Sequence, residues 1–516
     1  MKKSTLALFF TILFSFSPLV YSANLNIGLS SSTTSMDPQF YVGGANSAMA
    51  RNIFDSLVSQ DEKQQIFPAL ATSWKIIDDK TWEFALRPGV KFHDGSDFTA
   101  RDVIASIKRI ALASKNSPSS YAPYVTDIVE VKEINPLTVR IVTKAPAPLL
   151  LNNLSRVSIL PARLENVPTE TLNSGKDVIG TGPFKFVSWV PDDRVVLERN
   201  ENYWGGNAEW DKVTIRVFKN SSARVAAILS GDVDMIENVP TADSSNIKNN
   251  SQLHTISTPG NRIIYLHMDQ QRDISPFAKG PDGRNPLLKK EVRQAMSLAL
   301  NRQAIVDRVM DGQAVAASQL VPKGYFGYSA SIPAPVYNPE KAKQELAAAG
   351  YPNGFTLTFH ASNDRYPNDS KIAQAIGQMF TRVGIKTDVV TMPGSVYFSR
   401  AARLEFSLIM GGAAVETGEA SGVLGPLLET FGPHTGQGNR GRYSNPAFDK
   451  MLNEARSTLE SNKREALLTE AMNIGMSDLG VIPVMFLSNT WAMKKQYTYV
   501  GRSDAYTLPY FVRSAR

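Results

Sequence analysis

The chain has 516 residues, no cysteine and a formal net charge of +7 at pH 7. Its length predicts two or more domains, and the absence of cysteine excludes both a small disulfide-stabilised domain and thiolate chemistry. Its 55 basic and 48 acidic residues are interspersed, which is typical of a mixed solvated surface, so we expect no nucleic-acid partner.

Residues 1–23 have the pattern of an export signal. Lys2 and Lys3 precede an apolar run over residues 6–14, and the small residues before Asn24 favour cleavage after Ala23, with Ser22 as the alternative. The apolar run is shorter than the roughly 20 residues of a membrane-spanning helix. A lipid anchor would require a cysteine after the signal. We therefore expect a soluble, unanchored protein in a Gram-negative periplasm.

The first half of the chain after this signal predicts mainly strands. We expect a helix near its start, over residues 45–58, and a second helix capped by Thr99 and beginning at Ala100. Period-two alternation runs from Trp74 to Phe92, with a turn before its last residues. Further strands are expected over residues 24–29, 138–142, 184–190, 195–199 and 213–217.

Helices and strands alternate in the second half. Apolar spacing predicts helices over residues 288–310, 339–349 and 370–383, and strands over residues 356–360 and 386–390. This alternation is typical of an α/β sheet. No long linker separates the two halves, so we expect domains connected by several chain crossings.

No catalytic or metal-binding motif is convincing. The nucleophile elbow, the P-loop and the zinc-protease motif do not occur, and the loose S-x-x-K match at Ser245–Lys248 lacks companion motifs. The histidines lie far apart: His93, His254, His267, His360 and His434. His93 with Asp94 and Asp97 is interpreted as part of a turn, because Gly95 supplies a positive φ. We therefore expect no enzyme, no metal and no cofactor.

Several long motifs follow one another in a characteristic order: FPALATSW at 67–74, WEFALRPGVKFHDG at 82–95, TARDV at 99–103, GTGPF at 180–184, NENYW at 200–204 and YSNPAFD at 443–449. Together they resemble the extracellular solute-binding proteins of peptide-type ABC importers, family 5. The likeness extends over nearly the whole chain after the signal.

The resemblance implies a two-lobed α/β fold, the periplasmic-binding-protein fold of type II, cluster C. Lobe I would cover residues 24–265 with an extra subdomain at about 55–179, and lobe II residues 266–485. Residues 486–516 would return to lobe I, which makes a hinge of two crossings. The implied protein is a monomer that captures a peptide or peptide-like solute between its lobes and delivers it to an inner-membrane permease.

The resemblance also suggests two residues that bind the ligand. In dipeptide-binding relatives an aspartate in a G-W-x-x-D stretch pairs with the ligand amine, and Glu416 takes its place here, with Ala413 in place of the tryptophan. Arg365 occupies the position of an arginine that binds the ligand carboxylate, for which its planar fork is suited. Alternatively, Glu416 is a surface carboxylate and Arg365 pairs with Asp364 or Asp369. The small Ala413 would allow a bulkier or modified ligand.

Other residues are weaker lining candidates. Tyr41, Gly43 and Asn46 lie in the first loop, and Asn439 and Arg440 lie in a late loop that continues to Arg442. Tyr397 and Trp491 are aromatic residues that we expect in loops, as we do Tyr121. Within the same fold, a nickel chelate, haem, glutathione or a sugar-phosphate conjugate is an alternative ligand. An envelope hydrolase and an envelope chaperone or sensor are alternatives from other classes.

Overall fold

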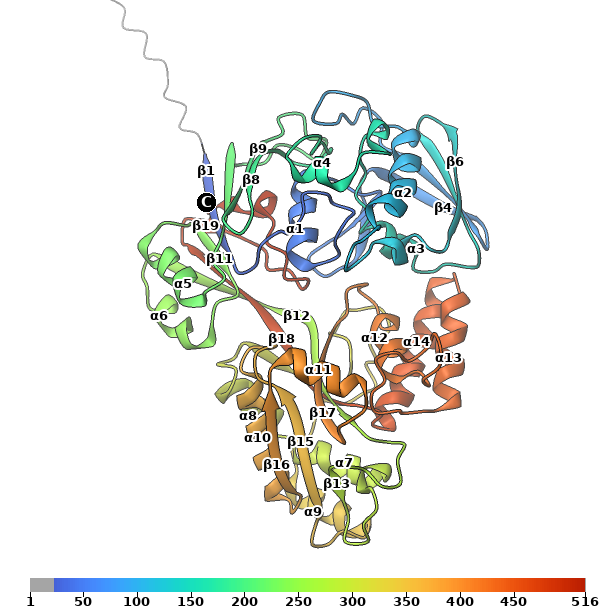
Figure 1. Cartoon of the computed structure of the whole chain (residues 1–516), viewed down its shortest axis with the longest axis vertical. Coiled ribbons are helices and arrows are strands. Elements are labelled where there is room, and N and C mark those ends of the chain that lie inside the picture. Colours follow the sequence, from blue (N-terminus) through green and yellow to red (C-terminus); the bar gives the residue numbers. More distant parts are fainter. Residues whose placement is uncertain (1–22, 516) are drawn as a thin grey trace, which may run out of the picture.

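The computed structural model describes residues 23–515, which form two lobes joined by two long strands (Figure 1). The upper lobe contains the first part of the chain together with its C-terminal segment, and the lower lobe contains the interval between them. The predicted signal peptide lies outside the described residues except for Ala23. No helix in residues 23–515 is long and apolar enough to cross a membrane.

One large sheet extends through both lobes. Its strand order is β13-β15-β17-β12-β18-β11-β1-β10-β9-β8, with β14 added to β18 and β16 added to β15. The strands span β1 (Asn24–Leu29), β8 (Phe184–Val190), β9 (Arg194–Arg199), β10 (Lys212–Val217), β11 (Met235–Glu237), β12 (Leu253–Met268), β13 (Ala278–Lys279), β14 (Ala314–Ala316), β15 (Thr356–Ser362), β16 (Lys386–Met392), β17 (Leu408–Ala414) and β18 (Ile482–Lys494). Parallel and antiparallel pairs are mixed: β1 and β10 are parallel, and β12 and β18 are antiparallel.

The antiparallel strands β12 and β18 form the connection between the lobes. Their register shifts between Pro259 and Ile263, and Gly260 lies at this shift. A Cβ atom on Gly260 would lie 2.5 Å from the Leu487 carbonyl oxygen, so only glycine allows the strands to approach this closely. The interruption makes this point of the two strands a natural hinge.

Buried side chains divide along the same line. The two large clusters of the lower lobe lie within residues 263–487. Those of the upper lobe lie before residue 254 or after residue 490. The change of core therefore falls at residues 253–263 and 487–491.

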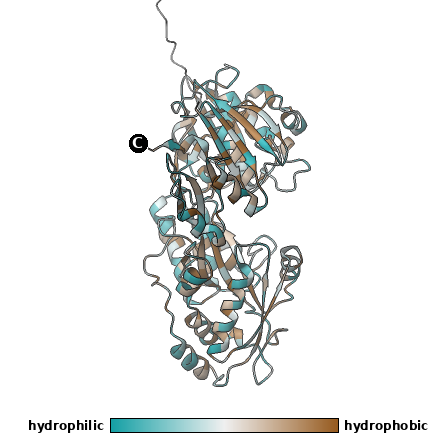
Figure 2. Ribbon diagram, turned by 90° about the vertical axis from the view of Figure 1, so that its left-hand side faces the viewer, coloured by the Kyte–Doolittle hydropathy of each residue, from teal (hydrophilic) through white to brown (hydrophobic). Residues whose placement is uncertain are grey.

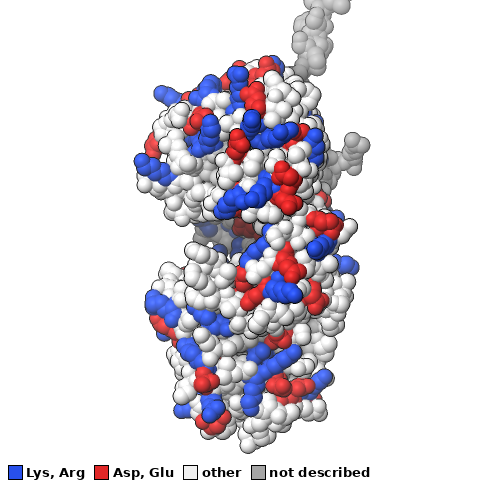
Figure 3. All heavy atoms as spheres, turned by 90° about the vertical axis from the view of Figure 1, so that its right-hand side faces the viewer, with Lys and Arg blue, Asp and Glu red and all other residues white. Residues whose placement is uncertain are grey.

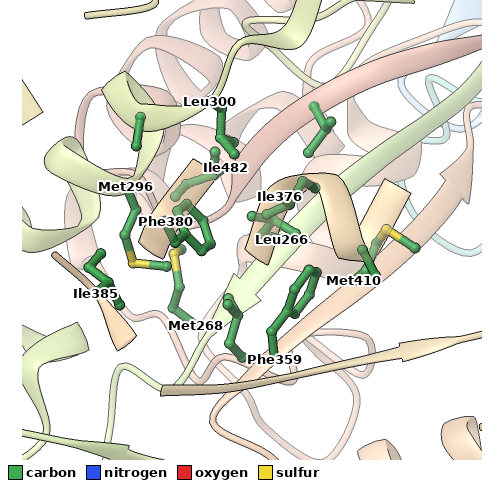
Figure 4. Packing of buried hydrophobic residues seen from close by; sticks show 14 of the residues in the cluster. Leu266, Met268, Met296, Leu300, Phe359, Ile376, Phe380, Ile385, Met410 and Ile482 are labelled. Atoms are coloured by element: carbon green, nitrogen blue, oxygen red, sulfur yellow. The ribbon is translucent and has the colours of Figure 1, made fainter. Parts of the chain in front are cut away.

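The lower-lobe sheet is buried on both faces. Along β12, Ile264, Leu266 and Met268 pack into one cluster with Phe359 and Phe380 (Figure 4). The alternate residues Ile263 and Tyr265 pack into a second cluster beneath α12 (Ser421–Leu428), α13 (Pro446–Ser457) and α14 (Ser461–Ser477). Because successive side chains of a strand point to opposite faces, this strand needs apolar residues at nearly every position.

The upper lobe carries a separate four-stranded antiparallel sheet of order β4-β5-β7-β6. Its strands are β4 (Ala71–Asp78), β5 (Thr81–Leu86), β6 (Ile128–Asn135) and β7 (Thr138–Thr143), beside a hairpin of β2 (Val58–Gln60) and β3 (Ile66–Pro68). Trp82, Phe84 and Leu86 alternate into its buried cluster, as the period-two pattern predicted. Figure 2 shows apolar stretches along strands in both lobes.

The helices cover these sheets and differ from two of the predictions. They span α1 (Gly44–Ile53), α2 (Ala100–Ala113), α3 (Leu150–Leu154), α4 (Thr169–Asn173), α5 (Ser221–Ser230), α6 (Ser244–Lys248), α7 (Lys290–Ala299), α8 (Arg302–Arg308), α9 (Pro339–Ala348), α10 (Asp369–Arg382), α11 (Gly394–Ala402), α12 (Ser421–Leu428), α13 (Pro446–Ser457) and α14 (Ser461–Ser477). The prediction of one helix over residues 288–310 is wrong: Leu300 is extended, and the Asn301 side chain caps α8 by accepting from Ala304 N at 2.9 Å. The first helix ends at Ile53 rather than at residue 58, because Phe54 is extended.

α2 begins at Ala100, as the sequence predicted, and the capping role of Thr99 can be tested. Asp102 Oδ2 accepts hydrogen bonds from Thr99 N at 2.7 Å and from Thr99 Oγ1 at 3.1 Å. We expect Thr99→Ala to lower the free energy of unfolding by about 1 kcal/mol, the usual cost of losing an N-cap. Urea unfolding measures this change, and Thr99→Ser, which keeps the hydroxyl, should differ little from the original protein. An equal loss in both variants would contradict the capping role.

Candidate ligand-binding cleft

Several polar contacts join the lobes beyond the hinge. Arg156 of the upper lobe lies 3.3 Å from Glu416 Oε2 of the lower lobe, and Asn152 donates to the Thr417 carbonyl at 2.6 Å. On other parts of the interface, Gln65 donates to the Gly324 carbonyl at 3.4 Å and Asn368 to Thr241 at 3.1 Å. Figure 3 shows a hollow between the lobes, with charged side chains visible inside it. We call the space beside the Arg156–Glu416 contact the cleft.

The lower-lobe wall of the cleft is built around Tyr366. The Arg365 guanidinium lies 5.2 Å from the centre of the Tyr366 ring. Arg262, within β12 beside the hinge, and Arg440, in a late loop, are close enough to influence the same hydroxyl. Burial raises the pKa of Tyr366, whereas the three guanidinium groups act in the opposite direction. Burial lowers the pKa of Arg262, and the like charge of Arg365 lowers it further.

None of these three arginines has an ion-pair partner among residues 23–515, whose ion pairs involve other arginines: Arg101, Arg109, Arg140, Arg156, Arg163, Arg194, Arg199, Arg272, Arg400, Arg403, Arg456, Arg464 and Arg502. Asp364 and Asp369 do not pair with Arg365. Asp364 instead accepts from Gly394 N at 2.7 Å, and Asp369 accepts from Ser362 Oγ at 2.8 Å.

Small residues at the end of β17 allow two tyrosine rings to pack against its backbone. A Cβ atom on Gly411 would lie 2.7 Å from the Tyr265 hydroxyl oxygen, and one on Gly412 would lie 2.8 Å from the Tyr366 ring. The two tyrosine rings thus cover glycine backbone directly. Ala413, which follows, is half-buried and leaves this end of the strand without a bulky side chain.

The upper-lobe wall comes from four segments. Ser47 in α1 lies 3.4 Å from the Tyr121 hydroxyl, and the Arg156 guanidinium lies 5.6 Å from the Tyr124 ring centre. Tyr506, in the C-terminal segment, shares a small crevice with Ser47, Tyr121 and Arg156. This wall is therefore aromatic and basic.

The predicted residues divide into three groups. Glu416, Arg365, Ala413 and Arg440 lie together on the lower-lobe side of the cleft. The Glu416 side chain is 53% exposed and already faces Arg156, so a ligand amine would share it with that guanidinium.

Tyr41 and Gly43 lie just before α1 on the upper lobe. A Cβ atom on Gly43 would lie 2.6 Å from the Tyr41 ring. The ring therefore packs against the glycine that precedes the helix.

Four predicted lining residues are instead buried, and their side chains form hydrogen bonds with other groups of the protein. Asn46 accepts from Thr34 N at 3.3 Å, and Asn439, fully buried, donates to the Glu429 and Tyr443 carbonyls. Tyr397 donates to the Met410 carbonyl at 2.7 Å from within α11, and Trp491 donates to Thr507 at 2.9 Å from within β18. The expectation that Tyr397 and Trp491 lie in loops is wrong, because both aromatic side chains complete lobe cores.

Two basic residues of the cleft region were not predicted: Arg156 and Arg262. Arg262 had a usable signal, since it directly precedes the apolar run that begins at Ile263. A long charged side chain at the edge of such a strand is unusual unless it faces solvent or a ligand. Arg156 had no comparable signal, because its position depends on the approach of the other lobe.

The histidine region interpreted as a turn is confirmed as one. Gly95 N donates to the Phe92 carbonyl at 2.9 Å, and Gly95 has a φ of 87°. Burial lowers the pKa of His93 to about 4, and its Nε2 lies 3.0 Å from the Gly182 carbonyl oxygen. In the described part of the chain, no group of three or more histidine, aspartate or glutamate side chains is arranged to hold a metal ion.

Comparison with known proteins agrees with this architecture. Residues 65–434 match the family described as bacterial extracellular solute-binding proteins, family 5. The chain is 30% identical to the glutathione-binding protein of Pectobacterium atrosepticum, over 89% of this chain and 87% of that protein. It is also 30% identical to the haem-binding protein A of Haemophilus influenzae, over 86% of this chain and 83% of that protein.

A solved structure shares the fold over almost the entire chain. It is the ABC transporter-associated periplasmic binding protein DppA from Helicobacter pylori in complex with the peptide STSA. The two are 25% identical with a TM-score of 0.71, and the match covers 96% of this chain and 99% of that one.

Proposed function

Because the chain belongs to the bacterial extracellular solute-binding proteins of family 5, which bind solutes for ABC importers, we propose that its solute is a small peptide-like molecule with more than one carboxylate. It is held between the lobes and passed to an inner-membrane permease. Closure of the lobes about the hinge encloses it.

The observation that carries this proposal is the excess of unpaired positive charge. Arg262, Arg365 and Arg440 surround Tyr366 without an ion-pair partner in the described chain. An uncompensated charge that becomes buried on lobe closure is costly. Ligand carboxylates remove that cost, because a guanidinium binds a carboxylate through two parallel hydrogen bonds.

The opposite charge on the ligand would be met by Glu416. This carboxylate lies near Arg262 and 3.3 Å from Arg156, so a ligand amine can join it at the mouth of the cleft. The space beside Ala413 accommodates a side chain of the ligand. Glutathione, the ligand named for one relative, has this pattern of two carboxylates and one amine. Haem, named for another relative, has two carboxylates and no amine.

Two measurements test the proposal. Mass spectrometry of the small molecules released when the purified protein is denatured should recover an acidic peptide-like compound. Calorimetry with the matched tripeptides Ala-Glu-Ala, Ala-Gln-Ala and Ala-Lys-Ala isolates charge, and the acidic peptide should bind at least tenfold more tightly than the neutral one. Added salt should weaken its binding. Equal affinities for all three peptides would contradict the proposal. Recovery of haem or a metal chelate would show that the solute is not a peptide-like molecule.

The role of Glu416 provides a separate prediction. We expect Glu416→Gln to weaken Ala-Glu-Ala binding at least tenfold, about 1.4 kcal/mol, because the ligand amine loses its counter-charge. Acetylating the peptide amine should cost about the same, and combining the two changes should cost little more than either alone. Additive losses in calorimetry would show that Glu416 does not bind the amine.

We further propose that the protein is an unanchored monomer of a Gram-negative periplasm that releases its solute unchanged. The absence of cysteine supports the lack of a lipid anchor. Gel filtration and hydrolysis assays on the tripeptides test these points. An envelope chaperone or sensor would instead bind unfolded chains without preferring acidic peptides.

A further inference from the structure

A second cavity lies within the upper lobe. Its volume is about 370 Å³, within the range of small-molecule pockets. The C-terminal half of α1, the β2–β3 hairpin, the loop at residues 203–205 and the C-terminal segment enclose it. Apolar side chains dominate its rim: Phe67 is 39% exposed, Phe511 43% and Val500 62%. All its lining residues belong to this lobe, so it does not depend on lobe closure.

Two buried amides in the cavity wall lack hydrogen-bond partners. Asn52 is 1% exposed and Gln60 is 3% exposed. Asn52 Oδ1 and Gln60 Nε2 have no partner, although the other half of each amide is used. Asn52 Nδ2 donates to the Ala48 carbonyl at 3.0 Å, and Gln60 Oε1 accepts from Arg51 at 3.5 Å. These bonds identify the free acceptor and the free donor.

An unpaired buried polar atom costs about 1–3 kcal/mol, so two beside one cavity need an explanation. The terminal torsions of asparagine and glutamine side chains are broad. Rotation about these torsions would turn Asn52 Oδ1 and Gln60 Nε2 toward a bound molecule without moving the backbone.

The charges around the cavity exclude a strongly charged ligand. Arg51 and Arg502 line it, but so do Asp55, Asp61 and Glu62. Asp55 already accepts from Trp204 Nε1 at 2.8 Å and from Thr181 Oγ1 at 2.9 Å. A net anion would face the carboxylates and a net cation would face the guanidinium groups.

We propose that this cavity binds an uncharged aromatic carboxamide or lactam, separately from the solute in the cleft. The amide N–H donates to Asn52 Oδ1, and its carbonyl oxygen accepts from Gln60 Nε2. The ring lies against Phe54, Trp204 and Tyr510, whose side chains line the cavity. Aromatic rings offer a large contact area at low entropic cost.

Three compounds of nearly equal shape test this inference on the purified protein: trans-cinnamamide, methyl trans-cinnamate and trans-cinnamate. Ligand-observed NMR should show the amide binding at least tenfold more tightly than the ester, which lacks a donor, and than the charged acid. Failure of the amide to bind, or equal binding of all three, would overturn the proposal.

Variants locate the binding. Gln60→Met and Asn52→Leu remove the donor and the acceptor with little change of shape, and each should weaken amide binding at least tenfold. The exposed Gln252 offers a matched control, Gln252→Met, which should have no effect. Ser59→Phe, which fills the cavity from β2, should also block binding while circular dichroism reports the fold.

The test is independent of the cleft. Arg365→Ala should leave amide binding unchanged, and Gln60→Met should leave Ala-Glu-Ala binding unchanged. If instead Arg365→Ala abolishes amide binding, the compound occupies the cleft and the second site is refuted. If the protein does not prefer the acidic peptide but still binds the amide, the proposed solute of the cleft is wrong and the second site stands.

Discussion

Arg262→Met should lower the affinity for Ala-Glu-Ala at least a hundredfold, about 2.8 kcal/mol. Arg262 is largely withdrawn from water within β12 beside the hinge, and burial already lowers its pKa. Truncating one member of a buried charge pair typically costs 2–5 kcal/mol, because the other charge is left unpaired. The more exposed Arg365 should matter less, and Arg365→Ala should cost about tenfold. Calorimetry measures both.

The control for this prediction removes an arginine elsewhere on the lower lobe. Arg284 is exposed, and Arg284→Met changes the net charge equally. Arg284→Met should change the affinity for the acidic peptide only slightly, because salt screens the interaction between distant charges. If Arg262→Met and Arg284→Met bind the acidic peptide alike, then Arg262 does not contact the ligand and the proposed carboxylate site is wrong.

Asp37→Ala should lower the free energy of unfolding by about 3–5 kcal/mol, because it leaves a buried guanidinium unpaired. Arg109 in α2 is 1% exposed, and its Nη2 lies 2.7 Å from Asp37 Oδ2. Its Nη1 donates to Asp37 Oδ1 at 3.0 Å, and Thr169 also donates to this carboxylate at 2.7 Å. The ion pair fixes the first loop, which continues to the start of α1.

Urea unfolding of Asp37→Ala and of a surface counterpart provides the test. Lys91 and Asp97 form an ion pair with side chains 47% and 69% exposed. Surface pairs contribute about 0–1 kcal/mol, so Asp97→Ala should change little. Similar losses in the two variants would mean that the buried pair is not what stabilises the loop. The m-value should stay constant if both variants unfold to the same state.

Predictions of strand bounds and helix starts succeeded where neighbouring residues alone determine the structure. β1 and β8 have the predicted bounds, and α2 begins at Ala100 as the Thr99 cap indicated. Strand alternation and caps depend on residues a few positions apart, so they can be read along the chain. The single helix predicted over residues 288–310 failed because the Asn301 cap interrupts an otherwise continuous apolar spacing.

The sequence by itself determined the family, through motifs spread over most of the chain, and with it the two lobes. The ligand-binding roles of Arg365 and Glu416 stay predictions. Only the tertiary structure decided which side chains share the cleft. Trp491 is conspicuous in sequence yet fills a core, whereas Arg156 is inconspicuous and reaches Glu416 across 260 positions of sequence. The unpaired Oδ1 of Asn52 and Nε2 of Gln60 likewise became visible only in three dimensions. Burial and pairing depend on contacts between distant segments, and spacing along one chain does not encode those contacts directly.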